Sequence, residues 1–457
     1  MANLPQATSY RPETAILELG ERCYDPVAAA DFPKTVLRFR NRRWDRAVGL
    51  GDWSDADWVR HFGRFEPLPD NLQTPLALRY HGHQFRQYNP DIGDGRGFLF
   101  AQLRDADGRL LDLGTKGSGQ TPYSRFGDGR LTLKGGVREV LATEMLEALG
   151  VETSKSFSLI ETGEALERGD EPSPTRSAVL VRLSHGHIRI GMFQRLAYER
   201  DDATMARLTA YVLEKLYGEA PGDEPALRLL DRVIDRTARL AGQYMAAGFV
   251  HGVLNSDNIN VTGESFDYGP WRFAPTWNPQ FTAAYFDHVG LYAFGRQPEA
   301  IQWDVMQLAA SLRLICEAQP MIDLLDTFGE RYQRHVSAAI LWRMGVEPRD
   351  AQRDAALVKA VESAIRPTET PIDQFFFDIF AQDLPDSYGK PFDEVRRAIA
   401  GYRYRKARTH PYWNGCGPCS MLIDEVEAIW SDIDRDDDWK RFDAKVAAIR
   451  RMGEALS

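Results

Sequence analysis

The chain has 457 residues, of which 43% are hydrophobic, 11% aromatic and 27% charged. This balance is typical of a globular protein with a large core and excludes disorder over most of the chain. The length fits two to four domains or one enlarged two-lobed unit. With 56 Lys and Arg against 66 Asp and Glu, the formal net charge is −10. We therefore expect no non-specific binding to nucleic acid.

The start of the chain and its cysteines indicate the compartment. Residues 1–20 include Glu13 and Glu18 and lack a basic leader with a long apolar run, which predicts neither a secretory signal nor a transit peptide. No apolar run approaches the ~18 residues of a membrane span, so we expect no membrane partner. Four cysteines are too few for a disulfide framework in a chain of this length. These features favour a cytoplasmic enzyme.

The first elements predicted along the chain form a small sheet with one helix. Residues 1–75 have little periodicity and are expected to be an irregular extension that packs on the core. Residues 98–103 and 110–113 are strand-like runs around a turn at 105–108. Apolar residues then recur every four positions from Val137 to Leu149, which predicts a helix over 133–149 with Gly150 as its stop.

Two further strands and a mainly helical region follow. The strands are predicted at 156–160 and 178–182, and apolar stripes over 205–216 and 227–247 indicate helices. A short strand is expected at 259–261. The order of elements predicts an α+β fold whose sheet precedes a larger helical part.

A glycine-rich segment precedes the first strand pair. Gly93-Asp94-Gly95-Arg96 would let the backbone approach phosphates closely, although it opens a hairpin and lacks the Lys-Ser/Thr of a Walker loop. A plain glycine turn is the alternative. Lys116 follows the second strand and Glu139 lies on the next helix. A strand lysine and a helical glutamate after a glycine-rich hairpin are the kinase arrangement for holding nucleotide phosphates.

The segment after the long helix is similar to a kinase catalytic loop. Such a loop has a His-x-Asp sequence with an Asn five residues after the Asp. Here His251 and Asn258 fit, but Val253 occupies the Asp position, and a carboxylate stands instead at Asp257. Asp267-Tyr268-Gly269 follows, similar to the Asp-Phe-Gly metal motif. Asn and Asp oxygens are hard ligands suited to Mg²⁺ held jointly with phosphates.

These segments together resemble the selenoprotein O family of kinase-like protein adenylyltransferases, also called the YdiU family. The similar stretches span about residues 78–305: 81–85, 93–96, 121–125, 127–130, 251–253 with 257–258, and 267–270. The resemblance implies a protein-kinase-like two-lobed fold in which ATP binds flipped. It also implies that AMP passes to a Ser, Thr or Tyr hydroxyl of a protein substrate, with Mg²⁺ as the cofactor.

The resemblance also implies roles for individual residues. Asp257 would be the general base, and Asn258 and Asp267 would bind Mg²⁺. Metal binding or orientation is the alternative role for Asp257. The expected nucleotide-binding residues are Gly93, Gly95, Arg96, Lys116, Asp128, Gly129, Glu139, Arg182, Arg189 and Asp267.

Several alternatives stay open at this stage. Uridylylation from UTP with Mn²⁺, phosphotransfer, and a nucleotide-binding pseudokinase scaffold are the competing functions, and self-modification is a further option. The expected parts are an extension (1–75), an N-lobe-like nucleotide-binding part (76–195), a helical C-lobe-like part (196–400) and a divergent helical tail (401–457). Within the tail, Cys416 and Cys419 have redox spacing, but no βαβ setting surrounds them. A structural pair and a redox switch are both open.

Overall fold

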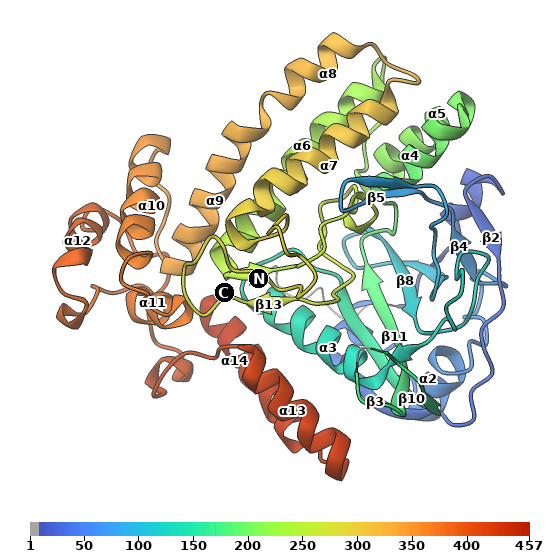
Figure 1. Ribbon diagram of the computed structural model, residues 1–457, viewed down its shortest axis with the longest axis horizontal. Helices are drawn as coiled ribbons and strands as arrows, with labels where there is room; N and C mark the ends of the chain where they lie inside the picture. Colours follow the sequence, from blue (N-terminus) through green and yellow to red (C-terminus); the bar gives the residue numbers. More distant parts are fainter. Residues whose placement is uncertain (1–8, 170) are drawn as a thin grey trace.

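The computed structural model describes residues 9–169 and 171–457 and shows two lobes, one built on a β-sheet and one made of helices. In Figure 1 the sheet lobe lies to the right, and helices α6 (Pro225–Ala247), α7 (Gln297–Leu312) and α9 (Phe328–Met344) form the centre of the helical lobe. The predicted α+β, two-lobed fold class is confirmed.

The main sheet of the described residues has nine strands, and most of them follow one antiparallel path in the order β2-β4-β7-β8-β11-β10-β3. β1 pairs with β7 at one side, and β9 pairs with β11. These strands are β1 (Pro12–Glu13), β2 (Tyr24–Pro26), β3 (Val36–Arg40), β4 (Leu76–Leu78), β7 (Leu99–Arg104), β8 (Leu110–Lys116), β9 (Leu131–Thr132), β10 (Lys155–Leu166) and β11 (Thr175–Ser184).

The expectation of an irregular segment over residues 1–75 is wrong in part. This segment contributes β1, β2, β3 and most of one face of the sheet lobe through α1 (Arg42–Ala47) and α2 (Asp55–Phe62). Short strands at a sheet edge carry too few residues to show an alternating pattern. Trp58 and Phe62 of α2 pack against Phe157 in an apolar cluster behind the sheet.

The central strands were predictable because both of their faces are covered. All but the last residue of β7 and every residue of β8 are buried, so they appear in the sequence as continuous apolar runs. The opposite face is covered by α3 (Leu133–Ala148). The Thr132 hydroxyl caps the N-terminus of this helix by accepting a hydrogen bond from the Gly135 N–H. Gly150, with φ of 80°, follows the helix end as predicted.

The helical lobe begins after the last strand of the sheet. Its helices are α4 (Ile190–Glu199), α5 (Asp202–Tyr211), extended by a π-turn at Val212–Leu216, α6, α7, α8 (Ala318–Leu325), α9, α10 (Ala351–Ile365), α11 (Ile372–Ile379) and α12 (Asp393–Ile399). Two separate two-stranded sheets complete the strands: β5 (Gly82–Gln84) with β6 (Gln87–Asn89), and β12 (Phe249–Val250) with β13 (Arg272–Phe273).

The strand expected at 259–261 is not formed. Asn260 makes only an isolated antiparallel bridge to Arg189, and Ile259 and Val261 bond the backbone of Ile190 and Ile188 on either side of it, so the pairing is too short for a strand. The left-handed residue Gly248 ends α6 and turns the chain into β12.

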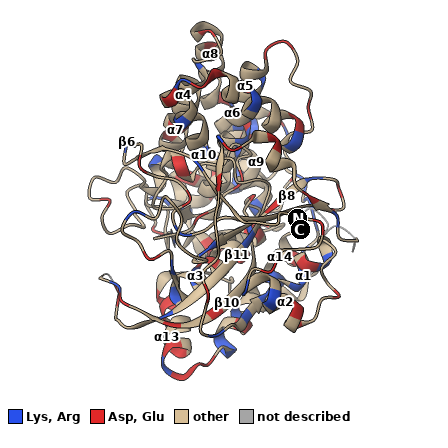
Figure 2. Cartoon of the chain, turned by 90° about the vertical axis from the view of Figure 1, so that its right-hand side faces the viewer, with Lys and Arg blue, Asp and Glu red and all other residues tan. Residues whose placement is uncertain are grey.

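Helices α13 (Ile423–Asp436) and α14 (Lys440–Leu456) return to the sheet lobe and lie beside α3 in Figure 1. Arg450 of α14 pairs with the buried Glu144 of α3 at 2.6 Å, so the end of the chain is part of this lobe. Figure 2 shows basic and acidic residues interspersed over both lobes. None of the helices in the described ranges is both long enough and apolar enough to cross a membrane.

Candidate active site

The core of the candidate site is an ion pair within the sheet lobe. Lys116 is the last residue of β8, and its ammonium group pairs with Glu139 of α3 and with Oδ1 of Asp267 at 2.9 Å. The side chains of Lys116 and Glu139 are 5% and 1% exposed. The pairing predicted from the order of these residues is therefore present. Because it is buried, removing either partner would leave an uncompensated charge in the core.

Two arginines converge on the same carboxylate. Arg182 of β11 lies 3.3 Å from Oδ1 of Asp267, and Arg189 lies close enough to act on it electrostatically. Burial opposes ionisation of Asp267, but Lys116 and the two arginines outweigh burial and hold its pKa well below the usual range. Without the family resemblance these arginines would be taken for surface residues. They are instead 5% and 6% exposed.

Arg189 also connects the glycine-rich segment to the catalytic loop. Its guanidinium donates to the Tyr80 hydroxyl at 2.9 Å, to the Asp257 carbonyl at 3.3 Å and to the Asp94 carboxylate at 3.2 Å. Its position over the ring of Phe266, 4.9 Å from the centroid, adds a cation–π contact. Arg189 thereby holds three separate segments around the site.

The Asp267 motif is anchored in the core by the side chain of its second residue, Tyr268. The hydroxyl of Tyr268 is buried and shares hydrogen bonds with Thr153 and Ser265. Asp267 itself has φ of 64°, a conformation that non-glycine residues seldom adopt. A tyrosine at the usual phenylalanine position therefore gives the motif a polar anchor in the core, and this anchor helps to keep Asp267 in its unusual backbone conformation.

The loop after α6 is tied to the Asp267 motif by a buried histidine. The buried His251 ring bonds the Phe266 carbonyl at 3.0 Å, so the loop is tied to the residue before Asp267. The Asn258 amide donates to the Val253 carbonyl at 3.0 Å. Val253, at the position of the kinase aspartate, contributes no acid–base group.

Asp257 is the carboxylate that the loop does provide. It lies in a 3₁₀ turn over Ser256–Asn258, is 8% exposed, and its Oδ1 has no hydrogen-bond partner. Burial raises its pKa to about 6, and the charge of Asp267 adds to this effect while Arg189 opposes it. A buried carboxylate with an unpartnered oxygen is suited to accepting a proton from a substrate hydroxyl.

The glycine-rich segment lies against a second loop. A side chain at Gly93 would overlap the ring of Tyr123, and one at Gly95 would meet the Tyr123 carbonyl at 2.9 Å. Arg96 is exposed, and its backbone carbonyl accepts the Gly117 N–H, next to Lys116. Glycines are thus required here for a close approach of two loops at the edge of the site.

Asp128 and Gly129 lie in that second loop and apart from the cluster around Asp267. The Asp128 carboxylate pairs with Arg168 at 2.8 Å, and Gly129, with φ of 70°, packs against Gly119. The structure therefore brings together Lys116, Glu139, Arg182, Arg189 and Asp267, and it places Asp128 and Gly129 at the rim.

The oxygen donors present fit a magnesium ion shared with a nucleotide. Because the Asn258 amide nitrogen bonds Val253, its Oδ1 is the side-chain atom left for a ligand. Asp267 Oδ1 faces cations that neutralise it, and one oxygen each of Glu139 and Asp257 lacks a partner. No group of three His, Cys, Asp or Glu within the described ranges forms a metal cluster by itself. Mg²⁺ usually takes one or two protein ligands and completes its shell with phosphates and water.

The site has a strand lysine paired with a helical glutamate, which is the kinase arrangement for holding nucleotide phosphates, and a nearby loop that lacks the kinase aspartate. A sequence model of the family "Protein adenylyltransferase SelO" matches residues 6–413. Two similar relatives are both named "Protein nucleotidyltransferase YdiU". The protein from Synechocystis sp. is 49% identical over 73% of this chain and 70% of its own length. The one from Gloeobacter violaceus is 43% identical over 96% and 95%. The chain belongs to the SelO/YdiU family of protein nucleotidyltransferases, as its motifs predicted.

The comparisons also bear on the C-terminal tail and on solved structures. The family model ends at residue 413, whereas the Gloeobacter protein matches 96% of this chain, so at least part of the tail is shared with that relative. A solved structure described as ROP2 from Toxoplasma gondii, with a protein-kinase fold and no enzymatic activity, matches 65% of this chain and 84% of its own. Its TM-score is 0.27 and its identity 13%, values too low to carry an argument.

Sequence reasoning missed four residues that the structure places at or beside the site. Tyr80, Asp94 and Phe266 all contact Arg189. Asp94 stands inside the glycine motif, where a carboxylate between two glycines was the available signal. Asp304 of α7 is fully buried, and the charge of Asp257 adds to the effect of burial in raising the pKa of Asp304. No local pattern marks it, because it lies 47 positions along the chain from Asp257.

The Cys-x-x-Cys pair has no disulfide. Cys416 is exposed and Cys419 is half-buried, and both thiols are free, like the other described cysteines. Burial raises the pKa of the Cys419 thiol, which lowers its reactivity. These observations favour a structural role over a redox one for Cys419.

Proposed function

We propose that this protein transfers AMP from ATP to Ser, Thr or Tyr hydroxyls of protein substrates, with Mg²⁺ and with ATP bound in the flipped orientation. The observation that carries this proposal is the meeting of three buried cations, Lys116, Arg182 and Arg189, around Asp267. Adenylyl transfer requires that the β- and γ-phosphates be held as the leaving group, and a buried cationic cluster is suited to this task.

The burial of these cations supports the flipped orientation. The three side chains are each only 5–6% exposed, so they form the closed end of the site. Phosphates bound there would place the base toward the rim, where Arg96, Asp128 and Gly129 lie. The α-phosphate would then face the catalytic loop, which carries Asp257.

The proposed reaction is an in-line displacement. The substrate hydroxyl oxygen forms a bond to the α-phosphorus, the bond from that phosphorus to the bridging oxygen breaks, and pyrophosphate leaves. Asp257 accepts the hydroxyl proton through its unpartnered Oδ1. Asn258 and Asp267 would hold Mg²⁺, which when bound neutralises phosphate charge. Lys116 and the two arginines orient the leaving phosphates.

The test is to incubate the protein with ATP labelled on either the α- or the γ-phosphate, together with a mixture of protein acceptors. Adenylylation predicts transfer of the α-label alone, and intact-mass analysis separates AMP from phosphate. Transfer of the γ-label alone would establish phosphotransfer instead. Parallel reactions with α-labelled UTP and Mn²⁺ test uridylylation and use the same readout.

The controls separate catalysis from scaffolding. Asp267→Ala is expected to abolish labelling while the fold is retained, as judged by circular dichroism. Asp378→Ala removes a carboxylate of the helical lobe that bonds Gln374 and Tyr388, outside the site, and should leave labelling unchanged. ATP binding without any transfer in the unmodified protein would favour the pseudokinase scaffold.

A further inference from the structure

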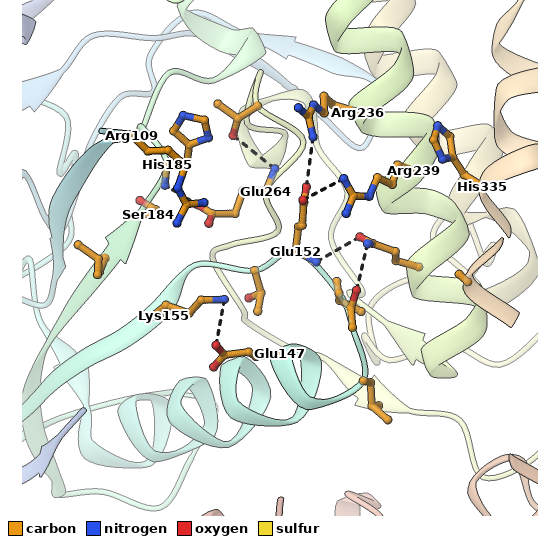
Figure 3. A pocket seen from close by; sticks show the side chains of 18 of the residues that line it. Arg109, Glu147, Glu152, Lys155, Ser184, His185, Arg236, Arg239, Glu264 and His335 are labelled. Atoms are coloured by element: carbon orange, nitrogen blue, oxygen red, sulfur yellow. Dashed lines mark hydrogen bonds and ion pairs between the residues drawn. The ribbon is translucent and has the colours of Figure 1, made fainter. Parts of the chain in front are cut away.

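A cavity of about 620 Å³ lies between the sheet and helices α6 and α9, and Figure 3 shows it from close by. Its walls come from the segment after α3, the end of β11, helices α6 and α9, and the segment that leads into Asp267. None of the residues assigned above to the nucleotide or the metal lines it. We call it the back cavity; the residues used below include Trp44, Glu147, Glu152, Lys155, Tyr217, Arg236, Arg239, Glu264 and Trp342.

Two arginines of the back cavity have guanidinium N–H groups that are not used by any described residue of the protein. Arg236 and Arg239 stand one turn apart on α6, and their side chains are 40% and 37% exposed. Within the described part of the chain, Glu152 is the only ion-pair partner of both, with N···O distances of 3.9 Å to Arg236 and 3.0 Å to Arg239. Figure 3 shows both guanidinium groups directed toward this carboxylate. Most of their N–H groups are therefore available to a ligand.

Lys155 and Arg109 add further positive charge to the lining, and of its acids only the exposed Asp107 has no described side-chain partner. Lys155 is 3.7 Å from Glu147, but Glu147 already accepts from Arg43 at 2.8 Å. Glu264 accepts the His185 N–H at 2.7 Å. Burial raises the pKa of Glu264 to about 7, so this group is only partly ionised at neutral pH. The cavity is consequently suited to an anionic ligand that also makes hydrogen bonds.

The apolar part of the lining indicates what accompanies the anion. Trp44, Tyr217 and Trp342 bring aromatic rings to the walls, and aromatic side chains bind planar rings well. A volume of about 620 Å³ is within the range of sites for small organic ligands. Bare phosphate would leave most of this space unfilled.

We propose that the back cavity is a second ligand site, which takes a nucleoside monophosphate with its phosphate on Arg236 and Arg239. The aromatic walls would contact the base, and Glu264 would accept from or donate to the polar edge of that base. This inference does not depend on which nucleotidyl group the active site transfers.

The cavity is connected to the metal motif through the backbone. The Ser265 N–H donates to the Glu152 carbonyl at 2.9 Å, and the Ser154 N–H donates to the Ser265 carbonyl at 2.9 Å. Ser265 stands two residues before Asp267. A phosphate that replaces Glu152 as the ion-pair partner of Arg236 and Arg239 would therefore shift the segment that positions Asp267. We expect such a ligand to change the rate of nucleotidyl transfer.

The test uses 8-azidoadenosine 5′-monophosphate as a photoaffinity probe on the full-length protein, with the modified peptides identified by mass spectrometry. We expect a modified peptide that contains Tyr217 or Trp342, separate from any peptide of the active site. The Arg236→Glu/Arg239→Glu variant should reduce this modification at least about tenfold, because two charge-assisted contacts are replaced by repulsion. Arg228→Glu on the same helix, whose guanidinium bonds the Ala220 carbonyl, is the matched control and should behave as the unmodified protein.

The outcomes decide the matter in either direction. Modification confined to active-site peptides would overturn the proposal, as would cavity modification that is equal in the arginine variant and the control. If the double Glu variant fails to fold, Arg236→Gln/Arg239→Gln keeps the size of the side chains and is expected to show the same loss. Unlabelled AMP, but not inorganic phosphate at the same concentration, should protect the cavity peptide; equal protection by phosphate would reject a nucleoside ligand.

Discussion

Replacing Asp257 by Asn should make the protein more stable and, at the same time, inactive. The reason is that the carboxylate is buried and one of its oxygens has no partner. Burial raises its pKa to about 6 from the ordinary 3.8. This difference corresponds to about 3 kcal/mol of unfavourable free energy for ionised Asp257 in the folded state.

The effect has a definite dependence on pH. Because the folded-state pKa is the higher one, the folded protein binds more protons than the unfolded chain between about pH 4 and pH 6. The cost of Asp257 is therefore absent below about pH 4, develops across this interval and is complete above it. Asp257→Asn should raise the free energy of unfolding by about 3 kcal/mol at pH 7.5 and by little at pH 4.

The assay is urea unfolding at several pH values with EDTA and without nucleotide, combined with α-label transfer from ATP under activating conditions. Transfer should fall by about 10²–10⁴-fold if Asp257 is the proton acceptor. Asp267→Asn is the matched contrast: its pKa is held low by cations, so this variant should be destabilised at neutral pH. A pH-independent difference, or a less stable Asp257→Asn protein at pH 7.5, would refute the reasoning.

Three further predictions concern the surroundings of the site and the metal. Asp304→Asn should also raise the free energy of unfolding more at pH 8 than at pH 5, because both oxygens of this fully buried carboxyl lack partners and burial raises its pKa; urea unfolding at the two pH values measures this. Tyr268→Phe should cost about 1–3 kcal/mol in the same assay, since Thr153 and Ser265 lose a buried partner. Removing divalent ions with EDTA should abolish α-label transfer, and adding Mg²⁺ back should restore it, with Asn258→Ala requiring more Mg²⁺ than the unmodified protein.

Each of these has a clear contrary result. A stability gain for Asp304→Asn that is the same at both pH values would show that its charge is not the cause. An unchanged Tyr268→Phe protein would mean that water replaces the lost hydroxyl. Full transfer in EDTA would exclude a dissociable metal from the reaction.

Much of the fold could be predicted because its central elements are buried on regular periods. The helix over 133–149 appeared as a four-residue repeat, since one face of α3 lies on the sheet. The strands over 98–103 and 110–113 appeared as apolar runs, since both faces are covered. The short strands of residues 12–40 could not be found in this way, because pairing with distant strands, rather than a local pattern, makes them part of the sheet.

The sequence by itself determined the family and the order of the lobes. It also predicted Lys116, Glu139, Asp257, Asn258 and Asp267 as site residues, because those predictions depend on residue type and spacing in local motifs. Only the tertiary structure decided that Arg182 and Arg189 are buried beside Asp267, and that a second charged cavity lies between the sheet and helices α6 and α9. The sequence gives the number and order of charged residues but does not show which of them are buried. Whether an arginine is solvated or enclosed depends on which distant segments pack around it, and that depends on the whole fold.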